Sequence, residues 1–419
     1  MKKRIIGSYK KLRETNILSN FFNLSGIQLS NVVLLFLIIR NVTGVVGIEV
    51  FGIVMFANRF AQFIGAIVNY GTNLSGVRDV AYNLNDINKL NTVFYNIIWI
   101  RAIIFTLFFL VFISLCFLQP NKHGYLLLAV PIVLSEVFNP LCFFIGTEKI
   151  KVFNVYNLVS NIIAIACILV FIKTPSSAYW VNFILGSLNT ITYIGLFIYL
   201  SISLKIRFQL PSKPELIQTA KDNFYLTVNS VSGNLQQSII IFALHWNNSI
   251  LLGAYTLSDR VIGQCRNLSN TIANAIYPNA VHLYKQSNKA WIIYRRKTKH
   301  ALTAMFFAGA IIIFILADFI VYLLTKEHDA NSILLLRIMA FVPVISALNL
   351  ANMLDQLIKN NTVYMFKVST ILFFIALLVT FISISLGSYF LIGAFTLIIE
   401  TSAWLMYEYI IKKTATQYA

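Results

Sequence analysis

Long runs of apolar residues constrain this chain more than any other feature of its sequence. They recur along all 419 residues, and each is close to the 20 or so mainly apolar positions that a helix needs to cross the hydrocarbon core of a bilayer. Only 11% of the residues are charged, against roughly 25% in a soluble domain. The chain has too few charges for a water-facing surface, so the pattern predicts a protein that crosses a membrane many times.

We expect about twelve transmembrane helices, and no loop is long enough to hold a separate domain. Pro131, Pro140 and Pro343 should break or kink their helices, because proline lacks a backbone N–H. The fold class is therefore an all-α integral membrane protein. The spans are predicted at residues 20–40, 46–70, 93–118, 124–146, 152–172, 178–204, 223–245, 251–276, 301–324, 332–356, 363–386 and 389–411.

Lysine and arginine residues gather in alternate connecting segments. With the N-terminus in the cytoplasm, the cytoplasmic segments hold 24 of the 33 basic residues. The outer ends hold only Arg40, Lys122, Lys173 and Lys326. Cytoplasmic loops of membrane proteins carry an excess of Lys and Arg, so both termini are predicted to be cytoplasmic.

A polar segment at mid-chain separates six predicted spans from six others. Short matches pair one span with the span six places later, such as residues 130–133 with 342–345. Because six is even, two such bundles share one orientation and would be related by a pseudo-two-fold axis along the membrane normal. The predicted domains are a six-helix bundle over 1–204, a cytoplasmic linker over 205–222 and a second six-helix bundle over 223–419.

The first, second, seventh and eighth spans are much more polar than the others. Unpaired polar groups that face lipid cost several kcal/mol each, so these side chains should line water or one another. We therefore expect a central aqueous cavity. Its predicted polar lining is Asn31, Asn58, Gln62, Asn234, Gln237 and Asn270.

Four arginines, Arg59, Arg101, Arg260 and Arg266, lie well inside predicted spans. A charge at a helix centre costs about 2.5–3.5 kcal/mol on an insertion scale, so each needs a compensating environment. A guanidinium can bind phosphate with two parallel hydrogen bonds. Arginines from both halves in one cavity therefore predict an anionic, phosphorylated substrate. Internal ion pairing is the alternative, for example between Arg101 and Glu136 in a neighbouring span.

Three carboxylates, Glu136, Asp259 and Glu400, lie at similar depth and are possible sites for coupling to a proton or sodium gradient. For each of them an internal ion pair is an equally good explanation. The cysteine and histidine spacing fits no metal site. A nucleotide-binding glycine-rich loop is missing from the sequence. We expect no catalytic residues, no cofactor and no nucleic-acid partner.

The motifs of the chain resemble those of the Wzx-type polysaccharide flippases, the O-antigen translocases of the multidrug/oligosaccharidyl-lipid/polysaccharide exporter superfamily. The resemblance covers nearly the whole chain. It is carried by Gly47–Gly52, Asn69-Tyr70-Gly71, Arg78-Asp79, Asn139-Pro140, Gly146–Lys149, Gly253-Ala254-Tyr255 and Tyr277-Pro278.

This resemblance implies a bacterial inner-membrane protein with twelve spans in two bundles around a cationic cavity. Its substrate would be an undecaprenyl-diphosphate-linked oligosaccharide repeat unit, moved to the periplasmic leaflet by alternating access. Arg59, Arg260 and Arg266 would hold the diphosphate. A polysaccharide polymerase and a chain-length regulator would be its partners.

Two other functions fit the sequence less well than a flippase. A multidrug or cation antiporter of the same superfamily would need carboxylates in the cavity, yet Asp259 sits directly beside Arg260. A membrane enzyme of polysaccharide assembly would usually carry a large extramembrane loop, and every outer loop here is short. Both features favour the flippase.

Overall fold

Helices make up nearly all of the structure, a computed structural model that describes residues 2–84, 86–118, 120–207, 209–359 and 361–417. Within these ranges it contains no strand. Nine segments of the described chain are long and apolar enough to cross a membrane. The predicted fold class, an all-α protein with many membrane spans, is confirmed.

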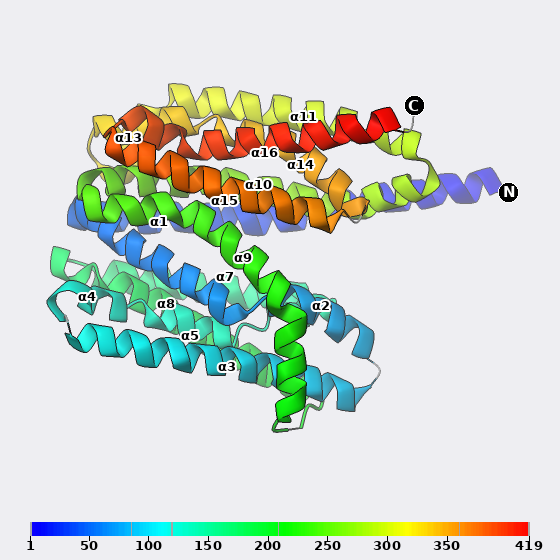
Figure 1. Cartoon of the computed structure of the whole chain (residues 1–419), viewed down its shortest axis with the longest axis horizontal. Helices are drawn as coiled ribbons and strands as arrows, with labels where there is room; N and C mark the ends of the chain where they lie inside the picture. The colour runs from blue at the N-terminus through cyan, green and yellow to red at the C-terminus, as the bar shows by residue number, and fades with distance from the viewer. Residues whose placement is uncertain (1, 85, 119, 208, 360, 418–419) are drawn as a thin grey trace. The chain divides into compact units, whose positions relative to one another are not determined.

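The helices are longer and more often interrupted than the predicted spans. Their bounds are α1 Lys2–Asn69, α2 Thr72–Asn83, α3 Ile87–Leu118, α4 Pro120–Leu127, α5 Val130–Val137, α6 Leu141–Gly146, α7 Ile150–Phe171, the 3-10 turn η1 Pro175–Ser177, α8 Trp180–Ser203, α9 Lys213–Asn247, α10 Ser249–Gln286, α11 Asn288–Ile315, α12 Ala317–Thr325, α13 Ala330–Met339, α14 Val342–Ile358, α15 Thr362–Ser385 and α16 Tyr389–Gln417 (Figure 1).

Several interruptions fall at the residues that the sequence marks. Pro131 and Pro343 lie in the first turns of α5 and α14, and Pro140 directly precedes α6. These prolines do break their spans as predicted, because each can begin a helix but cannot continue one. The first two predicted spans are joined in α1, which bends at Gly47 with φ 76°. Only glycine adopts that backbone conformation without strain.

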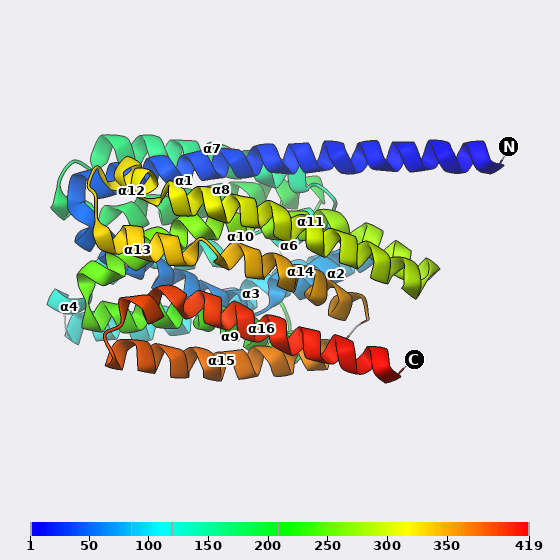
Figure 2. The ribbon, with the colours of Figure 1, turned by 90° about the horizontal axis from the view of Figure 1, so that it is seen from above.

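The chain forms two compact units. Unit 1 comprises Met1–Phe36 and Ala254–Ala419, and unit 2 comprises Leu37–Gly253. Within unit 1, α15 and α16 pack side by side, and α14 also contacts α16 (Figure 2). The predicted boundary at residues 205–222 separates two sequence repeats, whereas the two compact units are defined by contacts between residues. The two six-helix domains and their symmetry axis therefore stay predictions.

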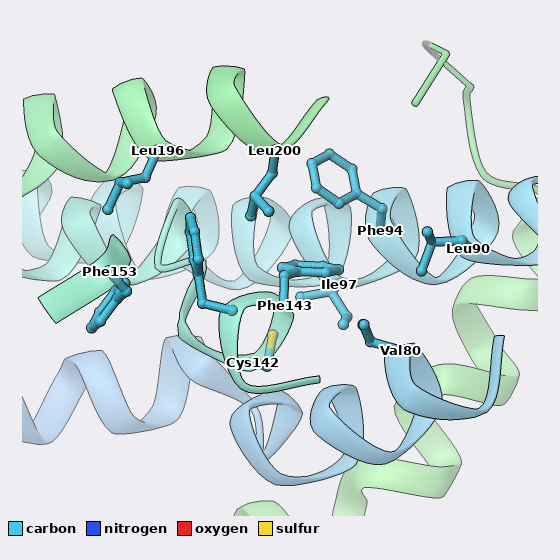
Figure 3. Packing of buried hydrophobic residues seen from close by; sticks show 10 residues of the cluster. Val80, Leu90, Phe94, Ile97, Cys142, Phe143, Phe153, Leu196 and Leu200 are labelled. Carbon is cyan, nitrogen blue, oxygen red and sulfur yellow. The ribbon is translucent and has the colours of Figure 1, made fainter. Parts of the chain in front are cut away.

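Unit 2 has an aromatic core between α2, α3, α6 and α8. Phe94 and Phe143 meet with ring centroids 4.7 Å apart, and Leu200 and Cys142 pack beside them (Figure 3). Rings at this separation contribute about 0.5–1.5 kcal/mol beyond the apolar area they bury. The core fixes the helix interruptions around residues 70 and 139, where polar side chains gather.

A close backbone contact fixes the start of α10 against α1. A Cβ atom added to Gly253 would lie 2.1 Å from the carbonyl oxygen of Ile48, and one added to Gly52 would lie 2.6 Å from the backbone nitrogen of Gly253. Only glycine fits at these two positions. The two glycine motifs singled out in the sequence therefore serve helix packing within unit 2.

Candidate functional site

Four of the predicted cavity residues come together in unit 2. Asn58 and Arg59 both neighbour Gln62 on the surface of α1, because residues three and four positions apart share a helix face. Gln62 donates to Asn58 over 2.9 Å, and Arg59 donates to Gln62 and to Gln237 of α9 over 3.5 Å each.

A residue that sequence reasoning missed anchors this group. Asn182 of α8 accepts a hydrogen bond from Asn58 over 3.0 Å and donates to the carbonyl oxygen of Val54 over 2.8 Å. It is 1% exposed. The position of this asparagine in the first turn of a strongly apolar helix is the signal that could have found it. We call Asn58, Arg59, Gln62, Asn182 and Gln237 the amide row.

One end of the amide row is buried and the other end is exposed. Asn58 and Asn182 are buried, whereas Gln237 is exposed. Hydrogen bonds of 3.5 Å are at the long limit for such contacts and hold a guanidinium weakly. The Arg59 guanidinium thus lies between Gln62 of its own helix and Gln237 of α9.

Asn234 belongs to the same helix as Gln237 and lies one turn before it. Its amide nitrogen donates to the carbonyl oxygen of Ser230 over 2.9 Å, so its donor group is used within α9. Asn31 and Asn270 lie outside the residues whose side chains the structure describes. Their predicted place in a cavity lining stays a prediction.

The predicted arginines of unit 1 are both on α10. Arg266 donates to Asp259, two turns earlier on that helix, over 2.5 Å. The two side chains are 18% and 15% exposed. This ion pair offsets the desolvation of both groups. Arg260 follows Asp259 directly and is half-buried.

Arg101 occupies a different environment from the one predicted for a substrate residue. It is 1% exposed. Its guanidinium donates to the Thr72 hydroxyl over 2.8 Å and to the Asn73 side chain over 3.2 Å, and to the carbonyl oxygens of Glu136 and Asn139 over 3.2 and 2.7 Å. Two of these bonds satisfy backbone carbonyls at the interruption between α5 and α6, and the other two join Arg101 to side chains at the start of α2. The structure therefore favours a structural role for Arg101.

The alternative of an Arg101–Glu136 ion pair is also corrected. Among the ion pairs of the described residues, none joins these two side chains. The Glu136 carboxylate instead accepts from Asn69 and Asn139 over 3.2 and 3.0 Å. Asn139 bridges the two charges, because its carbonyl oxygen accepts from Arg101 while its side chain donates to Glu136. We call Asn69, Thr72, Asn73, Arg101, Glu136 and Asn139 the Arg101 cluster.

Glu400, the third possible coupling carboxylate, lies on α16. It accepts a hydrogen bond from Asn349 of α14 over 2.7 Å. The three carboxylates thus have distinct partners: two amides for Glu136, an arginine for Asp259 and one amide for Glu400. Among the described residues there is no group of His, Cys, Asp and Glu that could hold a metal ion.

Comparison with known proteins gives a family and a fold. The family model described as polysaccharide biosynthesis protein matches residues 17–283. The "Putative O-antigen transporter" of Escherichia coli (strain K12) is 24% identical over 348 residues, which are 80% of this chain and 82% of that protein.

Solved structures with the same fold are transporters. A multidrug resistance MATE family transporter of the MOP superfamily, in its inward-facing conformation, matches with a TM-score of 0.71 and 14% identity, covering 92% of this chain and 96% of that one. A MOP superfamily transporter from Pyrococcus furiosus matches with a TM-score of 0.63 and 16% identity, covering 96% and 95%. At these identities the likeness establishes the fold.

Proposed function

This chain belongs to the polysaccharide biosynthesis protein family, and on that premise we propose that it is a flippase for undecaprenyl-diphosphate-linked oligosaccharide repeat units. It moves them from the cytoplasmic to the periplasmic leaflet by alternating access, without changing them chemically. The matched transporter fold and the name of the Escherichia coli relative both support movement of a polysaccharide-related substrate across a membrane.

The amide row is the observation that carries this proposal. It places Arg59 inside a span, where its guanidinium donates to the amide oxygens of Gln62 and Gln237. A phosphate oxygen would replace the two weak glutamine contacts with charge-assisted hydrogen bonds, which are about twice as strong as neutral ones. The amide groups of Gln62 and Gln237 would then be released to bind sugar hydroxyls.

Arg260 and Arg266 of α10 are also proposed ligands of the diphosphate, as the family resemblance implies. Arg266 already forms an ion pair with Asp259, so a diphosphate would compete with that carboxylate for the guanidinium. Asp259 is therefore one proposed coupling carboxylate, because substrate binding to Arg266 would change its partner. Glu136 and Glu400 stay alternative coupling sites. Arg101 is not included, since its donors are used within the fold.

The proposed setting is the inner membrane of a bacterium, with both termini in the cytoplasm. Its support is the placement of most basic residues in the segments assigned to the cytoplasmic side. A polysaccharide polymerase and a chain-length regulator are the proposed partners, because they act on the units that such a flippase delivers.

Substitution of Arg59 tests the proposal in cells. In a strain that depends on this protein for surface polysaccharide, Arg59→Ala should lower the polysaccharide roughly tenfold or more at unchanged protein level, since a hydrogen bond to a charged group is worth about 1.5–3 kcal/mol. Arg59→Lys should retain part of the activity. Arg337→Ala is the matched control, because Arg337 is exposed and lies over the Phe314 ring at 5.6 Å. Full activity of Arg59→Ala would refute the role of Arg59.

The antiporter alternative makes an opposite prediction. A cationic drug would need an available carboxylate, and Asp259 is engaged by Arg266. Uptake of a cationic dye by reconstituted protein, abolished by Asp259→Asn, would favour an antiporter over the flippase. Cleavage or polymerisation of the lipid-linked sugar by the purified protein would favour an enzyme.

A further inference from the structure

Helix α11 is longer than a membrane crossing needs. Its 28 residues span about 42 Å at 1.5 Å per residue, against about 30 Å for a hydrocarbon core. The excess lies at the N-terminal end, which holds five of the basic residues: Lys289, Arg295, Arg296, Lys297 and Lys299. This end must therefore lie at the level of the lipid headgroups or beyond it.

One face of this basic end packs against the rest of unit 1, and its charges are already compensated. The Trp291 indole and the Arg295 guanidinium both donate to the buried Asp355 carboxylate, over 2.7 and 3.1 Å. Lys299 pairs with Glu408 of α16. These residues fix the helix in place and leave no charge on this face for a ligand.

The opposite face is exposed and combines positive charge with apolar surface. Lys289, Ile292, Ile293, Arg296, Lys297 and His300 are all exposed and recur at intervals of three and four, so they form one stripe, here called the α11 stripe. Ile292 and Ile293 are 40% and 51% exposed. Among the described residues, none of the ion pairs involves Lys289, Arg296 or Lys297.

The same face becomes fully apolar further along the helix. After His300 it continues through Phe307, Ile311 and Ile315, which are exposed large hydrophobic residues. Exposed apolar side chains on a membrane-spanning helix face acyl chains. The change from basic to apolar therefore marks the boundary between headgroups and acyl chains, and it places the α11 stripe at the headgroups. A soluble acidic partner would not explain this continuity.

We propose that the α11 stripe is a binding site for the phosphate headgroups of anionic phospholipids. Lys289, Arg296 and Lys297 contact the phosphodiester oxygens, and the two isoleucines between them pack on the glycerol and upper acyl region. Basic residues close to a membrane surface each add about 1 kcal/mol of attraction to anionic lipid. Binding itself does not depend on the proposed flippase function; its assignment to the cytoplasmic leaflet depends on the proposed orientation.

Native mass spectrometry of the full-length protein in detergent tests this site. The probe is phosphatidylglycerol, with phosphatidylcholine as the zwitterionic reference. Wild-type protein should retain phosphatidylglycerol in preference to phosphatidylcholine. The variant K289Q/R296Q/K297Q should lose roughly tenfold or more of its phosphatidylglycerol affinity. The control K205Q/K213Q/K221Q removes three exposed lysines of the other unit and should keep the wild-type affinity.

Two further measurements separate the possible ligands. I292S/I293S should also weaken phosphatidylglycerol binding, because the lipid uses the apolar part of the stripe. Soluble pyrophosphate should not displace the lipid; if it does so at equal concentration, the stripe is a site for a diphosphate headgroup and the proposal is wrong. Equal losses in the stripe variant and the lysine control would likewise overturn it. Because flipping by these variants is a separate readout, failure of this proposal leaves the test of Arg59 unaffected.

Discussion

Two arginines of unit 2 that lie inside membrane spans, Arg101 and Arg59, differ in burial and in hydrogen bonding. Arg101 is buried and donates four hydrogen bonds of 3.2 Å or less to hydroxyl, amide and carbonyl oxygens. Arg59 is half-buried, and its hydrogen bonds to Gln62 and Gln237 are both 3.5 Å long. The same residue type thus makes four hydrogen bonds of 3.2 Å or less at position 101 and two of 3.5 Å at position 59.

The number and length of hydrogen bonds are a criterion for distinguishing a structural arginine from a substrate-binding one. Arg101 donates to two backbone carbonyls at the interruption between α5 and α6 and to two side chains at the start of α2, so removing it would leave these acceptors without their donor. The two hydrogen bonds of Arg59 given above join it to glutamine side chains only, so we expect its loss to disturb the backbone less than the loss of Arg101. Charge inside a span indicates a functional site by default. We expect the arginine with four short hydrogen bonds, Arg101, to be the one that serves the fold.

The largest expected effect is that of Arg101→Met. Loss of the guanidinium leaves the carbonyl oxygens of Glu136 and Asn139 without their donor, which should lower the free energy of unfolding by about 3–5 kcal/mol. Little folded protein should be recovered in detergent. The control Arg78→Met removes an exposed arginine that pairs with Asp79, and exposed pairs contribute about 1 kcal/mol or less. Normal thermal unfolding of Arg101→Met would remove the contrast with Arg59.

The second effect concerns the buried end of the amide row. Asn182→Leu removes the acceptor of Asn58 and the donor to Val54, so unfolding should become easier by about 2 kcal/mol. Since Asn58 also orients Gln62, flipping should fall with stability. Ile191→Ala, on the exposed side of the same helix, should change neither. An unchanged melting temperature for Asn182→Leu would mean that the row has no buried anchor.

The third effect compares unit 1 with unit 2. In a double-mutant cycle of Arg266→Ala and Asp259→Ala, the coupling free energy should be about 1–3 kcal/mol, because both groups are mostly buried. An equivalent cycle of Arg59→Ala and Gln237→Ala should give a coupling close to zero. Similar couplings in the two cycles would show that Arg59 is held as firmly as Arg266.

The smallest expected effect is that of Gln237→Ala. Gln237 is exposed and its contact with Arg59 is long, so the free energy of unfolding should change by less than about 0.5 kcal/mol. Flipping should fall roughly two- to fivefold, the equivalent of one neutral hydrogen bond. Asn247→Ala, an exposed amide at the end of the same helix that bonds its own backbone, is the control.

Much of the fold was predictable because hydropathy and helix length are local properties. The long apolar helices and the interruptions at Pro131, Pro140 and Pro343 follow from composition and from proline chemistry. The spans expected at 223–245 and 251–276 do form α9 and α10, although their polar residues keep them out of the nine apolar segments. The end of α11 at Ile315, within the predicted span 301–324, was not predicted, because no proline or glycine marks it.

The site was predictable only in part. Asn58, Arg59 and Gln62 could be grouped from the sequence, because spacing along one helix determines that they share a face. Asn182 could not be added, since its contact with Asn58 depends on how α8 packs on α1. The partners of Arg101 could not be predicted for the same reason. Two of them are backbone carbonyls at a helix interruption, and a sequence does not reveal which carbonyls lack a helical partner.

The most direct test of this account is flipping by purified protein in proteoliposomes. The substrate is undecaprenyl-diphosphate-linked oligosaccharide, and exposure of its sugar in the opposite leaflet is measured with a membrane-impermeant lectin. If the protein is a flippase that binds its substrate through Arg59, wild-type protein and Arg337→Ala should both move the substrate. Arg59→Ala should melt at the wild-type temperature and should not move it. Wild-type flipping by Arg59→Ala, or loss of flipping only together with loss of fold, would contradict this prediction.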